Sequence, residues 1–152
     1  MRGVAALHVV VRVGGERFGF RIADVEEALD APRLAPVPCA PPGLLGQLRY
    51  RERTVRAFDA GWLFGVARDG GAGMALVFRD GPERVVLVVD EVDDLADVPP
   101  EQIRPVPSGA DGEGVLRGVS VAADGRLVSL VRTSAMVSRA TALASFDRES
   151  VR

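Results

Sequence analysis

Few side chains of this sequence could take part in catalysis. His8 is the only histidine, and the alternation of strand residues around it predicts an imidazole that points outward, away from any assignable nucleophile or acid. Cys39 is the only cysteine, so an internal disulfide is excluded. Its place among prolines, without an assignable histidine partner, favours a structural thiol. We therefore expect no catalytic residue.

Two further segments have the composition of ligand sites but not their patterns. The acidic run from Asp90 to Asp97 lacks the central glycine and the distal glutamate of a calcium loop, which favours a solvated helical turn. The glycine-rich segment 68–73 is not followed by Lys-Ser/Thr, and the chain has no lysine, so a flexible connector is favoured over a phosphate loop. We expect no metal, no cofactor and no enzymatic activity.

Arginines gather on one predicted hairpin. The cluster consists of Arg49, Arg51, Arg53 and Arg56. A solvated face and a protein-contact patch are both compatible with it, because guanidinium groups pair well with carboxylates at interfaces. The whole chain has 19 basic and 21 acidic residues and a formal net charge of -2, which lacks the basic footprint of a nucleic-acid binder. We expect protein contacts and no nucleic-acid binding.

The apolar segments of the sequence indicate where in the cell the protein is expected. The apolar start of the chain is interrupted by His8 and Arg12, which is not typical of a secretory signal. No stretch approaches the roughly 20 apolar residues that span a bilayer. The lone cysteine suits a reducing compartment. We expect a cytoplasmic protein without direct membrane insertion.

Alternating apolar residues predict four β-hairpins. Their strands cover 7–13 with 17–22, 44–50 with 54–59, 74–78 with 84–89, and 116–121 with 126–131. Asp24, with Glu27 three residues on, predicts a capped helical turn that closes at Ala31-Pro32. Short apolar helical structure is expected at 61–65, and a terminal helix follows from residue 133. This pattern indicates an all-β protein with short helices.

An internal repeat organises these elements. Residues 12–27 align without gaps on residues 79–94, at an offset of 67 (79 − 12), and a weaker match sets 46–58 on 118–130, at an offset of 72 (118 − 46). Two copies of one β unit follow. Units of this size are near the lower limit for independent folding, so we expect the halves to share an interface, with a binding groove between them.

Several short motifs in the same order resemble the CheW family of bacterial chemotaxis coupling proteins, from Leu7 to about Val137. They lie at 11–27, 37–42, 88–92 and 116–128. The resemblance implies one CheW-like domain over 1–152, with two tandem five-stranded SH3-like β-barrel subdomains and a C-terminal helix. Subdomain one would cover about 12–66 and subdomain two about 74–131, with an N-terminal strand at 4–11 and a helix at 133–146 packing on the pair.

The same resemblance implies a non-enzymatic scaffold. Its partners would be the regulatory domain of a CheA-type histidine kinase and the cytoplasmic tip of a methyl-accepting chemoreceptor, which could recruit it to membrane receptor arrays. In the family, receptor hairpins lie in the groove between subdomains and kinase contacts use barrel ends. The implied protein-contact residues are Val25, Glu27, Gly46, Arg49, Arg51, Val55, Val89 and Val92. The alternative is a stand-alone regulatory or small-ligand-binding module that uses the groove between the barrels.

The central family motif, Gly-x-x-Asn-Leu-Arg-Gly followed at fixed spacing by Pro and Asp, is altered here. Anchoring it on Gly46 and Asp59 without gaps places Arg51 on the family arginine, whereas a second register uses Arg49 and needs two extra hairpin residues. Both registers stay open. In either one the glycine of the turn is replaced, and charged or bulky residues occupy the motif.

Overall fold

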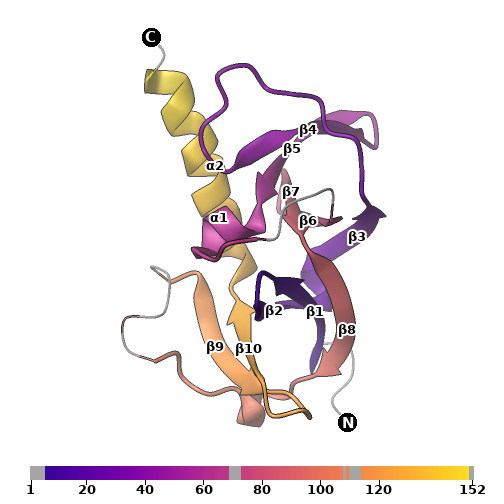
Figure 1. The fold of residues 1–152 in the computed structure, drawn as a ribbon, viewed down its shortest axis with the longest axis vertical. Coiled ribbons are helices and arrows are strands. Elements are labelled where there is room, and N and C mark those ends of the chain that lie inside the picture. The colour runs from indigo at the N-terminus through magenta and orange to yellow at the C-terminus, as the bar shows by residue number, and fades with distance from the viewer. Residues whose placement is uncertain (1–5, 69–72, 108, 110–113, 151–152) are drawn as a thin grey trace.

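A computed structural model describes residues 6–68, 73–107, 109 and 114–150, with side chains up to residue 144 (Figure 1). Residues 4 and 5 of the expected N-terminal strand, and 69–72 of the expected connector, lie outside the described residues. The elements are β1 Leu7–Val13, β2 Glu16–Arg21, η2 Ile22–Asp24, β3 Val25–Asp30, β4 Leu44–Tyr50, β5 Arg53–Asp59, α1 Ala60–Phe64, β6 Met74–Asp80, β7 Glu83–Val89, β8 Glu91–Asp97, η3 Pro100–Gln102, β9 Leu116–Val121, β10 Leu127–Val131 and α2 Thr133–Ser150.

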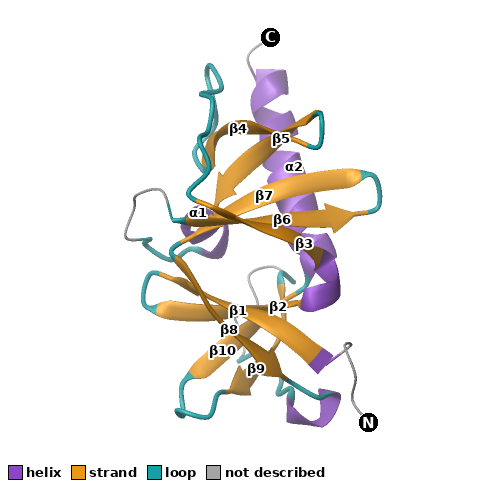
Figure 2. Ribbon diagram, turned by 90° about the vertical axis from the view of Figure 1, so that its right-hand side faces the viewer, coloured by secondary structure: helices purple, strands orange, loops and turns teal. Residues whose placement is uncertain are grey.

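The strands form two five-stranded sheets, one above the other in Figure 2. Barrel one has the strand order β8-β1-β2-β10-β9, and barrel two has the order β3-β6-β7-β5-β4. In each barrel one parallel pair, β2 with β10 or β5 with β7, joins strands that are otherwise antiparallel. The all-β class and the two five-stranded SH3-like subdomains are confirmed.

The expected division at 12–66 and 74–131 does not match these sheets. After β2 the chain passes through the three residues of η2 into β3, which pairs with β6 in the other barrel. Barrel one therefore combines β1 and β2 with β8, β9 and β10, and barrel two combines β6 and β7 with β3, β4 and β5. Each copy of the repeat gives its hairpin to the other copy's barrel, which a sequence offset alone does not reveal.

The repeat is visible in the element boundaries. β1 and β6 begin 67 residues apart, at Leu7 and Met74, and β4 and β9 begin 72 residues apart, at Leu44 and Leu116. Both strands that follow the hairpins, β3 and β8, were predicted as helical turns, and both predictions are wrong. The extended conformation wins there because each strand pairs along its length with the partner copy's hairpin.

Three apolar clusters fill the molecule. Barrel one encloses a small core around Val10, Val128 and Leu130, and barrel two encloses one around Val77 and Val86. The largest cluster lies between the barrels and combines side chains of both with those of α1 and α2. It includes the tilted ring pair of Phe20 and Phe78, whose centroids are 4.7 Å apart. The shared interface expected from the repeat is therefore the main core.

The hairpin strands are buried on both faces, and this explains an error at His8. One face of β1, with Val9 and Val11, belongs to the shared core, while Val10 on the other face belongs to the core of barrel one. His8 lies on the same face as Val10 and is 1% exposed, so the prediction of an outward imidazole is wrong. Alternation indicates an exposed face only where one side of a sheet meets water.

Helix α2 covers the side of the shared core, and α1 lies beside it (Figure 1). The buried residues Met136, Val137 and Ala140 of α2 belong to the largest cluster, and Leu143 is half-buried against it. The helix begins at Thr133 as expected and extends to Ser150, beyond the expected end at 146. The expected helical turn at 61–65 is confirmed as α1, whose N-cap Asp59 accepts from the amide of Gly61 at 2.8 Å.

A buried ion network fixes the junction between the barrels. Arg68, whose side chain is 6% exposed, donates from Nε to Asp59 at 3.0 Å and from Nη1 to Asp90 at 3.4 Å. Asp90 also accepts from the backbone amide of Gly14, in the β1–β2 turn, at 2.6 Å. One arginine thus connects the end of β5 in barrel two with the hairpin of barrel one.

Two glycines at matching positions allow the connectors to cross the sheets. Gly46 on β4 lies under residue Ala35, and Gly118 on β9 lies under Ile103 and Arg104. Each crossing is fixed by a backbone bridge, Ala35 with Gln47 and Arg104 with Val119. A Cβ at Gly46 would lie 2.6 Å from the Ala35 carbonyl oxygen, and one at Gly118 would lie 2.4 Å from Ile103 Cγ2. Neither position has room for a side chain.

We predict that Gly46→Ala and Gly118→Ala each lower the free energy of unfolding by about 1–3 kcal/mol, because the added methyl group displaces the crossing connector. Urea denaturation followed by circular dichroism measures this loss. Gly15→Ala is the matched control, since its Cβ would meet nothing within 4 Å. Equal stability of all three variants would show that the crossings tolerate a side chain.

Candidate protein-interaction surfaces

The β4–β5 hairpin closes through a two-residue turn, Arg51-Glu52, between the paired residues Tyr50 and Arg53. Both turn residues have positive φ, +49° at Arg51 and +66° at Glu52. This is the conformation of a type I′ turn, which favours Asn-Gly. A left-handed non-glycine residue costs about 1–2 kcal/mol, so other contacts must hold the turn in place.

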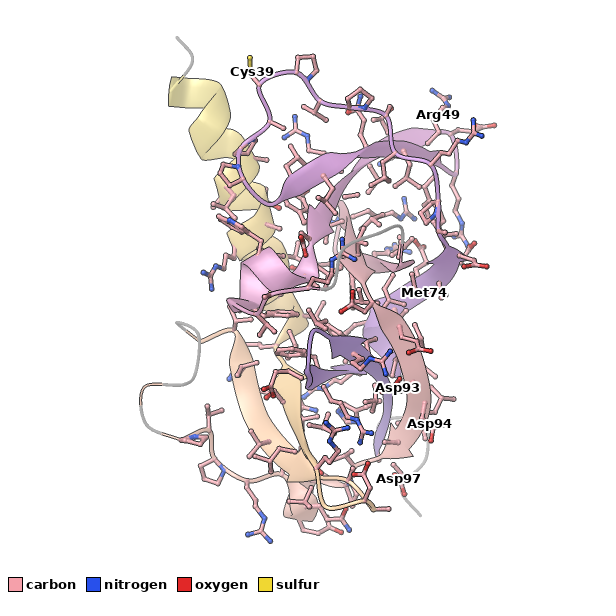
Figure 3. The ribbon with its side chains drawn as sticks, viewed as in Figure 1. Cys39, Arg49, Met74, Asp93, Asp94 and Asp97 are labelled. Atoms are coloured by element: carbon pink, nitrogen blue, oxygen red, sulfur yellow. The ribbon has the colours of Figure 1, made fainter. Side chains whose placement is uncertain are left out.

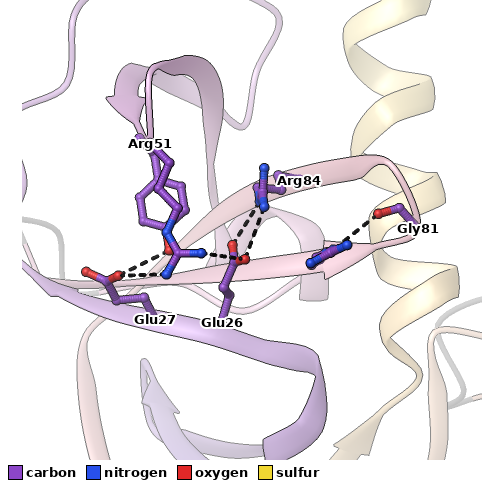
Figure 4. Close-up of polar contacts among 7 residues, drawn as sticks. Glu26, Glu27, Arg51, Gly81 and Arg84 are labelled. Atoms are coloured by element: carbon purple, nitrogen blue, oxygen red, sulfur yellow. Dashed lines mark hydrogen bonds and ion pairs between the residues drawn. The ribbon is translucent and has the colours of Figure 1, made fainter.

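Those contacts come from two glutamates of β3 (Figure 4). Arg51 Nη1 lies 3.2 Å from Glu26 Oε1, and Nη2 lies 3.9 Å from Glu27 Oε1. The Arg51 guanidinium also lies over the ring of Tyr50, 5.2 Å from its centroid, and the Tyr50 hydroxyl donates to Glu27 at 3.1 Å. Arg84 of β7 completes the group with two hydrogen bonds to Glu26, at 2.8 and 3.1 Å.

We call Glu26, Glu27, Tyr50, Arg51 and Arg84 the Glu26 cluster. The hydrogen bonds from Arg84 lower the pKa of Glu26 and raise that of Arg84, so both stay charged. Burial of the phenol, with the hydrogen bond to Glu27, raises the pKa of Tyr50. Since β3 and β4 are the two edge strands of barrel two, the cluster joins the edges and closes the barrel.

The structure separates the predicted contact residues into an accessible group of five and a buried group of three. In the first group, Glu27, Arg49 and Arg51 are exposed at or near the β4–β5 turn, and Val25 and Val92 are half-buried against the shared core. The remaining three are buried and serve packing: Gly46 under its connector, Val55 at 4% exposure and Val89 at 0%. A partner can meet the first group on the surface but not the side chains of the second.

The two candidate arginines of the family motif differ in their surroundings. Arg51 is held by carboxylates of its own chain. Arg49 lies on β4, is exposed, and makes only a 3.5 Å hydrogen bond to the Glu52 carbonyl within the described part of the chain (Figure 3). Of the two, Arg49 is the freer to pair with a partner's carboxylate.

Sequence reasoning missed a groove on barrel one. A cavity of about 820 Å³ opens between β8 and the β9–β10 hairpin, and all its lining residues belong to barrel one and its connectors. Acidic residues of β8 border it (Figure 3), and Leu95 lines it with 53% of its surface exposed. Val121 at 50% and the adjacent Leu127 at 57% extend the apolar surface. We call this the barrel-one groove.

Two charge pairs lie among the residues that line this groove. Arg17 Nη1 lies 2.9 Å from Asp124, and its Nε lies 3.7 Å from Asp93. A hydrogen bond from the Arg126 amide, together with Arg17, lowers the pKa of Asp124. One sequence feature could have indicated this groove: Leu95 lies within the acidic run. It was overlooked because the run was predicted as a helical turn rather than as a strand.

Cavities of about 240 and 180 Å³ lie between the barrels. Phe18, Phe64 and neighbouring residues line the second. Side chains of the shared core fill most of the interface where the sequence predicted a groove. Of these three cavities, the one with the largest volume is lined by barrel one and its connectors.

The residues with possible chemistry stay apart in the structure. Cys39 is exposed in the proline-rich connector (Figure 3), and His8 is buried on β1. Within the described ranges, no three His, Cys, Asp or Glu side chains are grouped so that they could hold a metal ion. The helices described there are also too short or too polar to cross a membrane.

Comparison with known proteins agrees with this architecture. The family model of the CheW-like domain matches residues 7–141, most of the chain. The chain belongs to the CheW-like family. Among solved structures, the scaffolding protein TtCheW from Thermoanaerobacter tengcongensis has a similar fold, with a TM-score of 0.75 and 20% sequence identity over 84% of each chain. A search of the curated proteins found no match. The CheW-like resemblance drawn from the sequence is confirmed.

We predict that the Glu26 cluster makes stability depend on acidic pH. Because the folded-state pKa of Glu26 lies below its ordinary value of 4.5, its contribution is complete above that value and is lost as the pH falls through the folded-state pKa. The difference in melting temperature between wild type and Glu26→Gln should therefore shrink between about pH 7 and pH 3.

Glu16→Gln is the control, since Glu16 is exposed on β2 and has no ion pair among the residues described. Its melting temperature should follow that of the wild type at every pH. Parallel curves for wild type and Glu26→Gln would contradict the assigned role of the cluster.

Proposed function

We propose that this protein is a non-enzymatic adaptor that couples chemoreceptors to a CheA-type histidine kinase in chemotaxis-like signalling. The match to the CheW-like domain over residues 7–141 supports this function. The observation that carries it is the barrel-one groove, where exposed Leu95 and Val121 lie beside a border of carboxylates, with exposed Leu127 paired to Val121 next to it. Exposed apolar side chains with a charged rim are typical of protein-interaction sites.

The regulatory domain of the kinase is the proposed partner for the groove. Leu95, Val121 and Leu127 would supply its apolar contacts, and the acidic border of β8 would face basic residues of the partner. The occupant of such a groove gains most of its affinity from a few buried apolar anchors. The surrounding carboxylates would mainly select and orient the partner.

The receptor tip is the proposed partner for the exposed group near the β4–β5 turn. Glu27, Arg49 and Arg51 offer both signs of charge there, beside the half-buried Val25. A rigid platform favours such contacts, because side chains fixed before binding lose less entropy on association. The Glu26 cluster and the tight turn supply that rigidity. The protein would then work in the cytoplasm, at receptor arrays.

The alternative of a small-ligand module between the barrels has less support. The cavities of about 240 and 180 Å³ that the described residues line there fall below the roughly 300–1,000 Å³ of most small-molecule pockets. The barrel-one groove has the volume but is open and bordered by carboxylates. A folded partner suits it better than an enclosed metabolite.

We predict that Leu95→Ser weakens binding to the regulatory domain of a CheA-type kinase from the same genome by at least about tenfold, by removing an apolar anchor. Leu45→Ser is the matched control, since Leu45 is 41% exposed on β4 of barrel two. Isothermal titration calorimetry measures both affinities. Equal affinities for the two variants would remove the groove from the interface, and no binding by the wild type would contradict the proposed function.

The same titration, extended to a receptor-tip fragment, tests the turn. Arg51→Glu places a third carboxylate beside Glu26 and Glu27, so we expect weaker binding of a partner while circular dichroism still shows a folded protein. Unchanged affinity for both the kinase and the receptor fragment would contradict the role of Arg51.

A further inference from the structure

A polar cavity of about 240 Å³ lies where the two barrels meet the first turn of α2. Three of its arginines come from the side of barrel one: Arg21 at the end of β2, Arg117 on β9 and Arg132 just before α2. A fourth, Arg79, comes from β6 of barrel two. The other lining residues are Asp24, Asp80, Val131, Thr133 and Ser134.

The positive charge of this cavity is not balanced. Four arginines and two carboxylates line it, and none of the four arginines forms an ion pair within the part of the chain that is described. The charge of Arg79 also acts on Glu26, whose pKa it helps to lower. One carboxylate, Asp24, already accepts a hydrogen bond from the Thr133 hydroxyl at 2.8 Å. Arg79 and Arg132 use only their Nε atoms, for the carbonyls of Gly81 and Gly114. Their terminal nitrogens make no hydrogen bond among the described residues.

Arg117 is the most constrained of the four. The Nδ1–H of His8 donates to the Ala6 carbonyl at 2.9 Å, which leaves Nε2 to accept from Arg117 Nη2. Arg117 Nε is buried and has no hydrogen-bond partner among the described residues. Burial, with the like charges of Arg21 and Arg132, lowers the pKa of Arg117. An unsatisfied buried donor beside two other cations is costly unless an anion compensates for it.

The start of α2 adds to the positive electrostatic potential of this cavity. The Met136 amide donates to the Arg132 carbonyl at 3.0 Å, which makes this the first hydrogen bond of the helix. The amides of the preceding residues have no partner inside the helix, and the helix dipole makes this end positive. Thr133 and Ser134, which line the cavity, belong to this first turn.

We propose that this cavity binds a phosphate group, either as inorganic phosphate or as the terminal group of a small phosphomonoester. A tetrahedral dianion can accept from several guanidinium groups at once, and arginine forks match its geometry. The cavity is several times the roughly 30 Å³ of a water molecule, which leaves room for one such group. The bound anion joins Arg79 of barrel two to the three arginines on the side of barrel one and so stabilises their arrangement.

The test measures thermal unfolding of the full chain in sodium phosphate and in sodium chloride of equal ionic strength. A ligand that binds only the folded state raises the melting temperature with its concentration. We expect phosphate to do so beyond chloride, and Arg21→Gln to weaken the apparent phosphate affinity by at least about tenfold. Arg21 is exposed, and its side chain makes no hydrogen bond or ion pair with another described residue, so this variant should fold.

Arg126→Gln is the matched control, because Arg126 is an exposed arginine of barrel one that does not line the cavity. It should keep the wild-type affinity within about twofold. Equal effects of phosphate and chloride, or equal losses in the two variants, would overturn the proposal by showing charge screening only. Glycerol phosphate distinguishes the two sources: binding at least as tight as that of inorganic phosphate identifies a phosphomonoester, and weaker binding identifies free phosphate.

This inference is independent of the adaptor function, because phosphate binding is measured without the kinase or the receptor. Failure of the phosphate test would leave the barrel-one groove and its partner unaffected.

Discussion

The exchange of hairpins between the two copies of the repeat is the constraint on which the rest of the structure depends. Neither copy contains a complete sheet, because β1 and β2 complete the barrel of the second copy and β6 and β7 complete that of the first. The exchanged hairpins are buried on both faces. One face of each hairpin lies in the core of its own barrel, and the other face belongs to the core shared between the barrels. Burial of this apolar surface stabilises the pair as one unit, where single units of about half the chain would be marginal.

The exchange also determines which surfaces remain for partners. Phe20, Phe78 and their neighbours fill much of the interface between the barrels, so the large apolar surface left for a protein partner lies on the outer faces. One is the barrel-one groove with Leu95, Val121 and Leu127, and the other is the charged turn at Arg51. Each lies on a different barrel, and the fixed shared core keeps them in a constant relation. That geometry suits a protein proposed to hold two partners in one array.

Much of this fold could be predicted from sequence, and the errors have physical causes. The hairpins and the repeat followed from alternation and turn residues, but the exchange did not, because an offset is the same whether copies pair internally or with each other. The orientation of His8 was predicted wrongly because β1 is buried on both faces. The acidic segment of β8 was predicted as a helical turn, but it is a strand because it pairs with β1. Val55 and Val89 were predicted as contact residues from the family resemblance, but both are buried and pack inside the protein. Exposed Leu95 was missed for the same reason as β8.

The central claim is that the two barrels unfold together. Trp62, the only tryptophan, lies in α1 with its ring over Gly43, so its fluorescence reports on barrel two. Leu130→Ala removes a fully buried side chain from the core of barrel one and should cost about 2–5 kcal/mol. In urea denaturation of this variant, we predict that the Trp62 midpoint falls as far as the circular dichroism midpoint, in one transition. A Trp62 midpoint that stays at the wild-type value, with a separate earlier transition by circular dichroism, would contradict the account.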